Sequence, residues 1–247
     1  MSTPSVYVVT GASRGLGLEL SKQLLERGDT VVAAARNPSS SSGLMALQKQ
    51  HPQNLSLITL DTADPSSVEA GGVRIRGLHS SVDVLINNAG IAGTSARPSE
   101  MDPGEFPDTF KTNVVGPYLV TRALLPLIKK GKKKQIFQIS STMGSIGNLA
   151  ANLKGSGRYP YASKAQLAYR ASKAALNMET LSLAADLQED GITVVSMCPG
   201  HVTTDMGGER GEVNAPESIA GQLKVFDSVN PEDTGKFYNF EGNVVPY

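Results

Sequence analysis

The chain has 247 residues, of which 40% are hydrophobic and 19% charged, a composition that suits one globular domain with a substantial core. Its 23 basic and 23 acidic residues balance, so no excess charge favours nucleic acid or an acidic membrane surface as a partner. The single cysteine, Cys198, excludes an internal disulfide, and we expect no metal site because no Cys or His residues accompany it at metal-ligand spacing.

The N-terminal stretch MSTPSVYVVT leads straight into a strand-like run. It has neither the basic region nor the long apolar stretch of a signal peptide. No window of the sequence approaches the length of a membrane span. We therefore expect a cytoplasmic protein without a membrane partner.

Short β-branched runs alternate along the chain with longer amphipathic segments, such as 14–27 and 103–130. This alternation predicts an α/β fold: a doubly wound parallel sheet of the Rossmann type, in three layers, with helices on both faces. We expect residues 1–247 to form this single domain. The expected strands are 6–10, 31–35, 55–60, 82–87, 135–140 and 192–198.

A glycine-rich turn, TGASRGLG at 10–17, separates the first expected strand from the first helix. Ligands of such folds bind beyond the carboxyl ends of the strands. Glycines there allow a tight turn and close approach of the backbone to a diphosphate, which then faces the helix N-terminus. The position of this turn predicts a nucleotide site.

The spacing G-x-x-x-G-x-G resembles the classical short-chain dehydrogenase/reductase family, and the resemblance covers nearly the whole chain. The further matching stretches are NNAG at 87–90, ISS at 139–141, YRASK at 169–173 and PGHVTTDM at 199–206. Within the family, the chain is similar to carbonyl reductases of the sniffer and C-factor kind. This similarity lies in the stretch after residue 141, on the helix that follows and at the end of the chain.

The resemblance implies four catalytic residues: Asn113, Ser141, Tyr169 and Lys173. In the family, the serine orients the substrate carbonyl, and the asparagine helps to hold a water that links the lysine to solvent. The lysine holds the nicotinamide ribose and favours ionisation of the phenol, which would otherwise be a poor acid and base near pH 7. A strand-end serine or a helical asparagine found alone would indicate no function.

A second motif, YASK at 161–164, offers an alternative catalytic tyrosine and lysine. In a helix, residues four apart face nearly the same way, which Tyr169 and Lys173 satisfy and the YASK motif does not. Tyr169 also lies 22 residues before the turn at Gly191, as the family layout requires. Three roles stay open for Tyr159 and Tyr161: packing, substrate contact, or being the true catalytic tyrosine.

The stretch between the serine and the tyrosine is longer than is usual in the family and predicts an insertion in a surface loop. Its last part, 161–168, could extend the catalytic helix towards the N-terminus. We expect substrate specificity to lie in three irregular segments, 91–106, 142–168 and 206–215.

The second expected strand ends in Ala35-Arg36-Asn37 without an acid. An arginine there suits a 2′-phosphate, so we expect NADP(H) to be preferred over NAD(H). For Arg36 and Arg122, a plain surface position is the alternative. The expected cofactor-binding residues are Gly11, Ser13, Arg14, Gly15, Leu16, Gly17, Arg36, Asp61, Asn88, Ala89, Gly90, Arg122, Tyr169, Lys173, Pro199, Val202 and Thr204.

These residues predict an NADP(H)-dependent oxidoreductase that reduces a small-molecule ketone or aldehyde to an alcohol, or catalyses the reverse, with Tyr169 as acid and base. The alternative is a protein of this fold without redox turnover, either an NADP(H) sensor or a recruited biosynthetic cyclase. The absence of one of the four catalytic residue types would favour this alternative, and all four types are present. A homo-oligomer is left open.

We expect Cys198 to be a buried residue, and a nucleophile assisted by His201 is the alternative.

Overall fold

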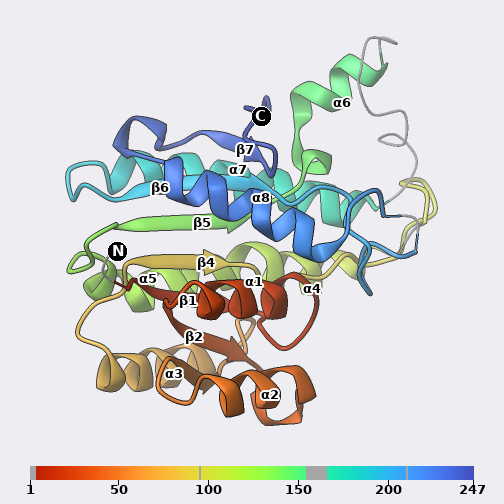
Figure 1. Cartoon of the computed structure of the whole chain (residues 1–247). Helices are drawn as coiled ribbons and strands as arrows, with labels where there is room; N and C mark the ends of the chain where they lie inside the picture. Colours follow the sequence, from red (N-terminus) through yellow and green to blue (C-terminus); the bar gives the residue numbers. More distant parts are fainter. Residues whose placement is uncertain (1–3, 95, 154–165, 210) are drawn as a thin grey trace.

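The computed structural model describes residues 4–94, 96–153, 166–209 and 211–247 (Figure 1). Seven strands in these residues form one parallel sheet in the order β3-β2-β1-β4-β5-β6-β7. The strands are β1 Val6–Thr10, β2 Thr30–Ala35, β3 Leu55–Thr59, β4 Val84–Asn87, β5 Gln135–Ile139, β6 Thr193–Cys198 and β7 Phe237–Asn239. The helices are α1 Gly15–Glu26, α2 Ser42–Gln50, α3 Pro65–Leu78, α4 Glu105–Phe110, α5 Gly116–Ile128, α6 Ile146–Leu153, α7 Leu167–Asp186 and α8 Ala215–Ser228.

The strand order reverses beside β1, which pairs with β2 on one side and β4 on the other. The chain therefore winds outward twice from the centre of the sheet, and the crevice at this switch point is where such folds bind ligands. All six expected strands are confirmed to within two residues at their ends. The short edge strand β7 was not predicted.

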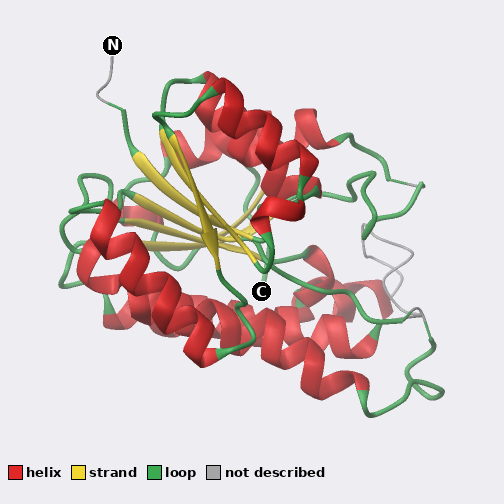
Figure 2. Ribbon diagram, turned by 90° about the horizontal axis from the view of Figure 1, so that it is seen from below, coloured by secondary structure: helices red, strands yellow, loops and turns green. Residues whose placement is uncertain are grey.

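The sheet lies between two layers of helices, seen edge-on in Figure 2. One hydrophobic cluster joins the sheet to α1, α2 and α8, and a second joins it to α3, α5 and α7. On the first face Phe137 of β5 stacks on Phe226 of α8, with ring centroids 3.9 Å apart. The expected three-layer α/β fold is confirmed. No helix among the described residues combines the length and the apolar character that crossing a membrane requires.

The expected helical segment 103–130 is not continuous. It consists of α4, a π-helical turn at Lys111–Val115 and α5. A π turn fits one extra residue into the helix, so it changes the direction in which its side chains point. Asn113, expected on a long helix, lies inside this turn.

The expected irregular segment 142–168 is also partly helical. It contains the 3₁₀ turn Thr142–Gly144 and then α6. The suggested helical extension over 161–168 is wrong at Gln166, which has a left-handed φ of 65° and precedes the first residue of α7. Residues 161–165, like Tyr159, lie outside the described part of the chain.

Candidate active site

The glycine turn after β1 is fastened to the turn after β4. Gly11 has a φ of +66°, and a Cβ there would lie 2.8 Å from the Cα of Ala89. The hydroxyl of Thr10 accepts hydrogen bonds from the backbone N–H groups of Asn88 and Ala89, at 3.0 and 3.1 Å. The two motifs predicted from the sequence therefore form one rigid surface at the switch point.

The N-terminus of α1 faces open space at Gly15. This glycine has a φ of +54°, and the nearest atom to a Cβ placed there is Cγ2 of Thr204, 4.0 Å away. The neighbouring Arg14 forms an exposed ion pair of 3.8 Å with Asp205. A helix N-terminus stabilises an anion, so the open position at Gly15 is chemically suited to a diphosphate. These residues thus suit the expected dinucleotide.

The residues expected around the adenosine lie at the carboxyl ends of neighbouring strands. Arg36 is exposed directly after β2. Asp61 follows β3, and its Oδ1 accepts a bond of 2.9 Å from the backbone N–H of Ala63. Arg122, by contrast, is exposed on α5, which agrees with its alternative role as a surface residue.

The remaining cofactor residues occupy the walls of the same crevice. Ser13 is held through its carbonyl, which accepts a bond of 2.6 Å from the Ser41 hydroxyl. Leu16 packs against the core, and Gly17 is buried. On the opposite side the Pro199 carbonyl accepts a bond of 2.6 Å from Ser218. Val202 is buried, and the Thr204 hydroxyl accepts a bond of 3.1 Å from the Gly207 N–H.

Lys173 lies on α7 with its ammonium group directed at the end of β5. Its Nζ donates a hydrogen bond of 2.7 Å to the carbonyl of Ile139. The residue is only 4% exposed, and this burial lowers the pKa of Lys173 to about 8. One turn earlier lies Tyr169, whose ring centroid is 5.7 Å from the Nζ of Lys173. The structure therefore brings the predicted pair together on one helix face.

Burial raises the pKa of Tyr169 to about 12, although a hydrogen bond with the Ser141 side chain acts in the opposite direction and Cys198 adds to the rise. From the family resemblance, Lys173 is expected to favour the phenolate. The polypeptide alone does not stabilise the phenolate, because burial of the phenol away from water raises its pKa by more than the other groups lower it. Tyr169 therefore holds its proton near neutral pH.

Asn113 fastens the loop after β4 to α7. Its Oδ1 accepts a bond of 2.9 Å from the Ile91 N–H, and its Nδ2 donates bonds to the Ile91 carbonyl at 2.8 Å and to Ser172 at 3.0 Å. A Cβ added to Gly90 would lie 3.2 Å from this Oδ1 and 3.7 Å from the Nζ of Lys173. Asn113 and Lys173 therefore lie beside the same point of the chain.

Ser141 is the second residue after β5 and caps the 3₁₀ turn, since its Oγ accepts a bond of 3.1 Å from the Met143 N–H. The next residue, Thr142, donates its N–H to Sγ of Cys198 at 3.3 Å. Cys198 is 3% exposed, which confirms the buried interpretation. The sequence did not predict the contact of Cys198 with the 3₁₀ turn. A signal was present, because β5 and β6 are adjacent in the sheet and the residues at their ends therefore meet.

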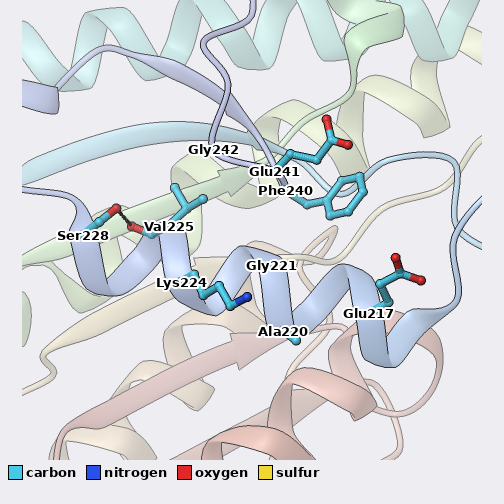
Figure 3. Close-up of a pocket in the computed structure, with 9 residues that line it drawn as sticks. All are labelled: Glu217, Ala220, Gly221, Lys224, Val225, Ser228, Phe240, Glu241 and Gly242. Carbon is cyan, nitrogen blue, oxygen red and sulfur yellow. Dashed lines mark hydrogen bonds between the residues drawn. The ribbon is translucent and has the colours of Figure 1, made fainter.

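A pocket of about 560 Å³ lies elsewhere on the molecule; Figure 3 shows the residues that line it. Glu217 and Lys224 of α8 line it together with Phe240 and Glu241 of the loop after β7. None of the residues that the sequence predicts for the site is among its described lining residues. We therefore place the candidate active site at the carboxyl ends of the central strands and not in this pocket.

Comparison with known proteins gives the same family as the motifs. The family model for short chain dehydrogenases matches residues 5–215. C-signal from Myxococcus xanthus is 43% identical over 166 residues, which are 67% of this chain and 93% of that protein. Two solved structures align over 100% of both chains: NADPH-bound carbonyl reductase from chicken fatty liver, with 36% identity and a TM-score of 0.85, and carbonyl reductase Sniffer of D. melanogaster, with 32% identity and a TM-score of 0.88.

The family match spans the glycine turn, the NNAG turn and all four expected catalytic positions. The solved relatives share the whole arrangement of sheet and helices with this chain. The chain therefore belongs to the short-chain dehydrogenase/reductase family, as an oxidoreductase of the carbonyl reductase, sniffer and C-factor kind.

Proposed function

We propose that this protein reduces a ketone or aldehyde to an alcohol with NADPH as the hydride donor, and that Tyr169 is the acid that protonates the product. The observation that carries the proposal is the meeting of Ser141, Tyr169 and Lys173. The Ser141 side chain lies near enough to the Tyr169 hydroxyl to lower its pKa, and Lys173 lies one helical turn further on with its Nζ beside the ring of Tyr169.

The protonation states support the direction of reduction. NADPH supplies a hydride to the carbonyl carbon when it is bound. The oxygen then needs a proton, which the Tyr169 hydroxyl donates while Ser141 holds the same oxygen by a hydrogen bond. With a pKa of about 12, Tyr169 is in the acid form before the reaction. Oxidation of an alcohol requires the phenolate, so it is favoured only at higher pH.

Lys173 and Asn113 act on the acid and the cofactor. With a pKa of about 8, Lys173 is still mostly protonated near pH 7, and its positive charge stabilises the phenolate that forms when Tyr169 gives up its proton. The same ammonium is placed to hold the nicotinamide ribose, as in the family. Asn113 fixes the chain beside Lys173. We also propose that it helps to hold a water molecule that links Lys173 to solvent, as in the family.

NADP(H) as the preferred cofactor also belongs to this proposal. Arg36 at the end of β2 and Arg14 at the start of α1 are exposed cations at the edge of the crevice. The carbonyl reductase from chicken fatty liver binds NADPH, and a short-chain dehydrogenase/reductase from Burkholderia multivorans binds NADP. The first of these shares 36% of its residues with this chain.

The direct test is to mix the purified protein with NADPH and a panel of aldehydes and ketones, and to follow both NADPH consumption and alcohol formation. We expect equal amounts of alcohol and NADP⁺ with at least one class of carbonyl compound. Tight NADPH binding without consumption across the panel would contradict the proposal and favour a sensor of NADP(H) or another non-redox role.

A further inference from the structure

The segment directly after Ser141 is held by the last two residues of the chain, 246 and 247, which we name the C-terminal clasp. The side-chain hydroxyl of Ser145 donates a hydrogen bond to the carbonyl of Pro246. The backbone N–H of Gly147 donates a bond of 2.8 Å to the carbonyl of Tyr247. The clasp therefore contacts the chain only a few residues after the expected catalytic serine.

The clasp is itself anchored to the edge of the sheet. The Tyr247 hydroxyl donates a bond of 2.7 Å to the carbonyl of Gly235, just before β7. Its ring stacks on Phe237, with centroids 5.6 Å apart, and Phe237 is fully buried. Tyr247 also packs on the small cluster that contains Cys198 and Val245. The clasp thus connects a rigid part of the core to the start of α6.

Ser145 transmits this connection towards the active site. The hydroxyl that donates to Pro246 also accepts a bond of 3.0 Å from the N–H of Asn148, so it caps the first turn of α6. Ser145 is 2% exposed. Its own N–H donates a bond of 3.1 Å to the Thr142 carbonyl, inside the 3₁₀ turn that Ser141 caps. A shift of Ser145 therefore moves the turn that carries Ser141.

The turn has no room to absorb such a shift. A Cβ added to Gly144 would lie 2.7 Å from the carbonyl carbon of Lys173, so the turn is packed directly onto α7 at the catalytic lysine. Asn177 of α7 holds the same glycine through a bond of 3.4 Å to its carbonyl oxygen. This packing fixes the place of the turn, and with it that of Ser141, relative to the helix that carries Tyr169 and Lys173.

We propose that the C-terminal clasp is a positioning element for Ser141, which it fixes at hydrogen-bonding distance from Tyr169 and the substrate carbonyl. The proposal rests on the proposed function, since Ser141 is the group that would hold the carbonyl oxygen. A displacement of about 1 Å in such a group is enough to lower turnover strongly. The glycine turn and the NNAG turn, which would hold most of the cofactor, are separate from the clasp, so we expect NADPH affinity to depend on the clasp far less than turnover does.

Gly147→Ala tests this directly. The added Cβ would lie 2.9 Å from the Tyr247 carbonyl and must displace the clasp. The matched control is Gly77→Ala on α3, where no atom lies within 4 Å of the new Cβ. Both changes replace a glycine in a helix by alanine, which is a better helix former. A loss of helix propensity therefore cannot lower the melting temperature of either variant. We expect Gly147→Ala alone to lower kcat/KM for the carbonyl substrate, about tenfold or more, and to change the Kd for NADPH by a much smaller factor.

Ser145→Ala provides a second variant and a measurement that does not need turnover. It removes the bond to Pro246 and the cap of α6, whereas the control Ser182→Ala removes an exposed hydroxyl on α7. We expect Ser145→Ala to speed hydrogen exchange at the amides of Gly147 and Asn148 and to lower kcat/KM. Ser182→Ala should change neither quantity.

Two results would overturn the proposal. One is a wild-type kcat/KM in both Gly147→Ala and Ser145→Ala. The other is a loss of NADPH affinity as large as the loss of turnover, which would indicate general damage to the fold. A wild-type protein that turns over no carbonyl compound contradicts the proposed function instead, and the exchange at Gly147 and Asn148 then still decides whether the clasp holds this segment.

Discussion

Tyr169 and Lys173 obtain their properties from burial at the ends of two strands. Lys173 donates a hydrogen bond to the last residue of β5. The side chains that act on the pKa of Tyr169 are Ser141, two residues after β5, and Cys198, the last residue of β6. Burial disfavours the charged form of each group, so it raises the pKa of the phenol and lowers that of the ammonium. The polypeptide thus prepares a proton donor, which is the form that carbonyl reduction requires.

Cofactor preference is a property of single residues at the edge of the crevice. Arg36→Asp replaces an exposed cation after β2 by the carboxylate that suits the ribose hydroxyls of NAD. We expect the ratio of kcat/KM for NADPH to that for NADH to fall by about 10- to 100-fold, since a charge-assisted hydrogen bond contributes roughly 1.5–3 kcal/mol. Arg74→Asp, on the exposed side of α3, should leave the ratio as it is. An unchanged ratio in Arg36→Asp would remove Arg36 from the site.

Glu179 of α7 makes the stability of the fold depend on pH. Burial raises the pKa of its carboxyl group to about 8, despite a hydrogen bond from Gln138. The folded chain therefore holds this proton more tightly than the unfolded chain, so its contribution to stability is complete below about pH 4.5 and is lost as the pH rises to about 8. Glu179→Gln should gain stability relative to wild type over this interval, of the order of 5 kcal/mol in total, since the pKa of Glu179 is raised from 4.5 to about 8.

Chemical denaturation at pH 5 and at pH 8.5 measures this difference. Glu189→Gln, which removes an exposed carboxylate just after α7, is the control for the loss of a surface charge. A stability difference between Glu179→Gln and wild type that is the same at both pH values would show that Glu179 does not titrate in this range in the folded state.

At the scale of elements, the active site depends on how α7 is fixed to the sheet. Asn177 is 3% exposed, and its Oδ1 accepts bonds from Ser140 after β5 at 2.6 Å and from Ser196 on β6 at 3.2 Å. Its Nδ2 also donates to the carbonyl of Gly144. One side chain thus joins the helix of Tyr169 to two strands and to the turn of Ser141.

Asn177→Leu should lower the free energy of unfolding by about 2–4 kcal/mol, because it leaves the buried Ser140 hydroxyl without its acceptor at 2.6 Å and removes the bonds of the amide to Ser196 and Gly144. Urea denaturation measures this loss. Asn243→Leu, an exposed position in the loop after β7, serves as the control and should stay within about 0.5 kcal/mol of wild type. A comparable small effect for Asn177→Leu would mean that the network does not hold α7 in place.

The elements also show where sequence patterns stop being informative. The π turn at Asn113 has the same apolar and polar pattern as a regular helix, since one extra residue in a turn changes direction but not composition. The strand β7 has three residues, too few to show a period. Both lie next to the site, and both are settled by tertiary packing, which a local pattern does not report.

For the molecule as a whole, the sequence predicted the layers and the parallel sheet, because buried strands and glycine turns leave direct traces in it; the place of the site stays a prediction. The i to i+4 spacing also identified Tyr169 and Lys173, which the structure places together. The pKa values, the partners of Asn113, the role of Cys198 and the clasp were not predictable. Each depends on residues far apart in the sequence that only the sheet brings into contact.

The central claim is that Tyr169 is the acid of an NADPH-dependent carbonyl reduction. Tyr169→Phe removes only the hydroxyl, so the decisive measurement is the rate of NADPH-dependent carbonyl reduction in this variant, with NADPH affinity determined in parallel. Tyr161→Phe tests the competing tyrosine, and Tyr118→Phe, on the surface of α5, is the matched control. We predict loss of turnover in Tyr169→Phe alone, with NADPH binding retained. Full turnover in Tyr169→Phe together with its loss in Tyr161→Phe would contradict the account.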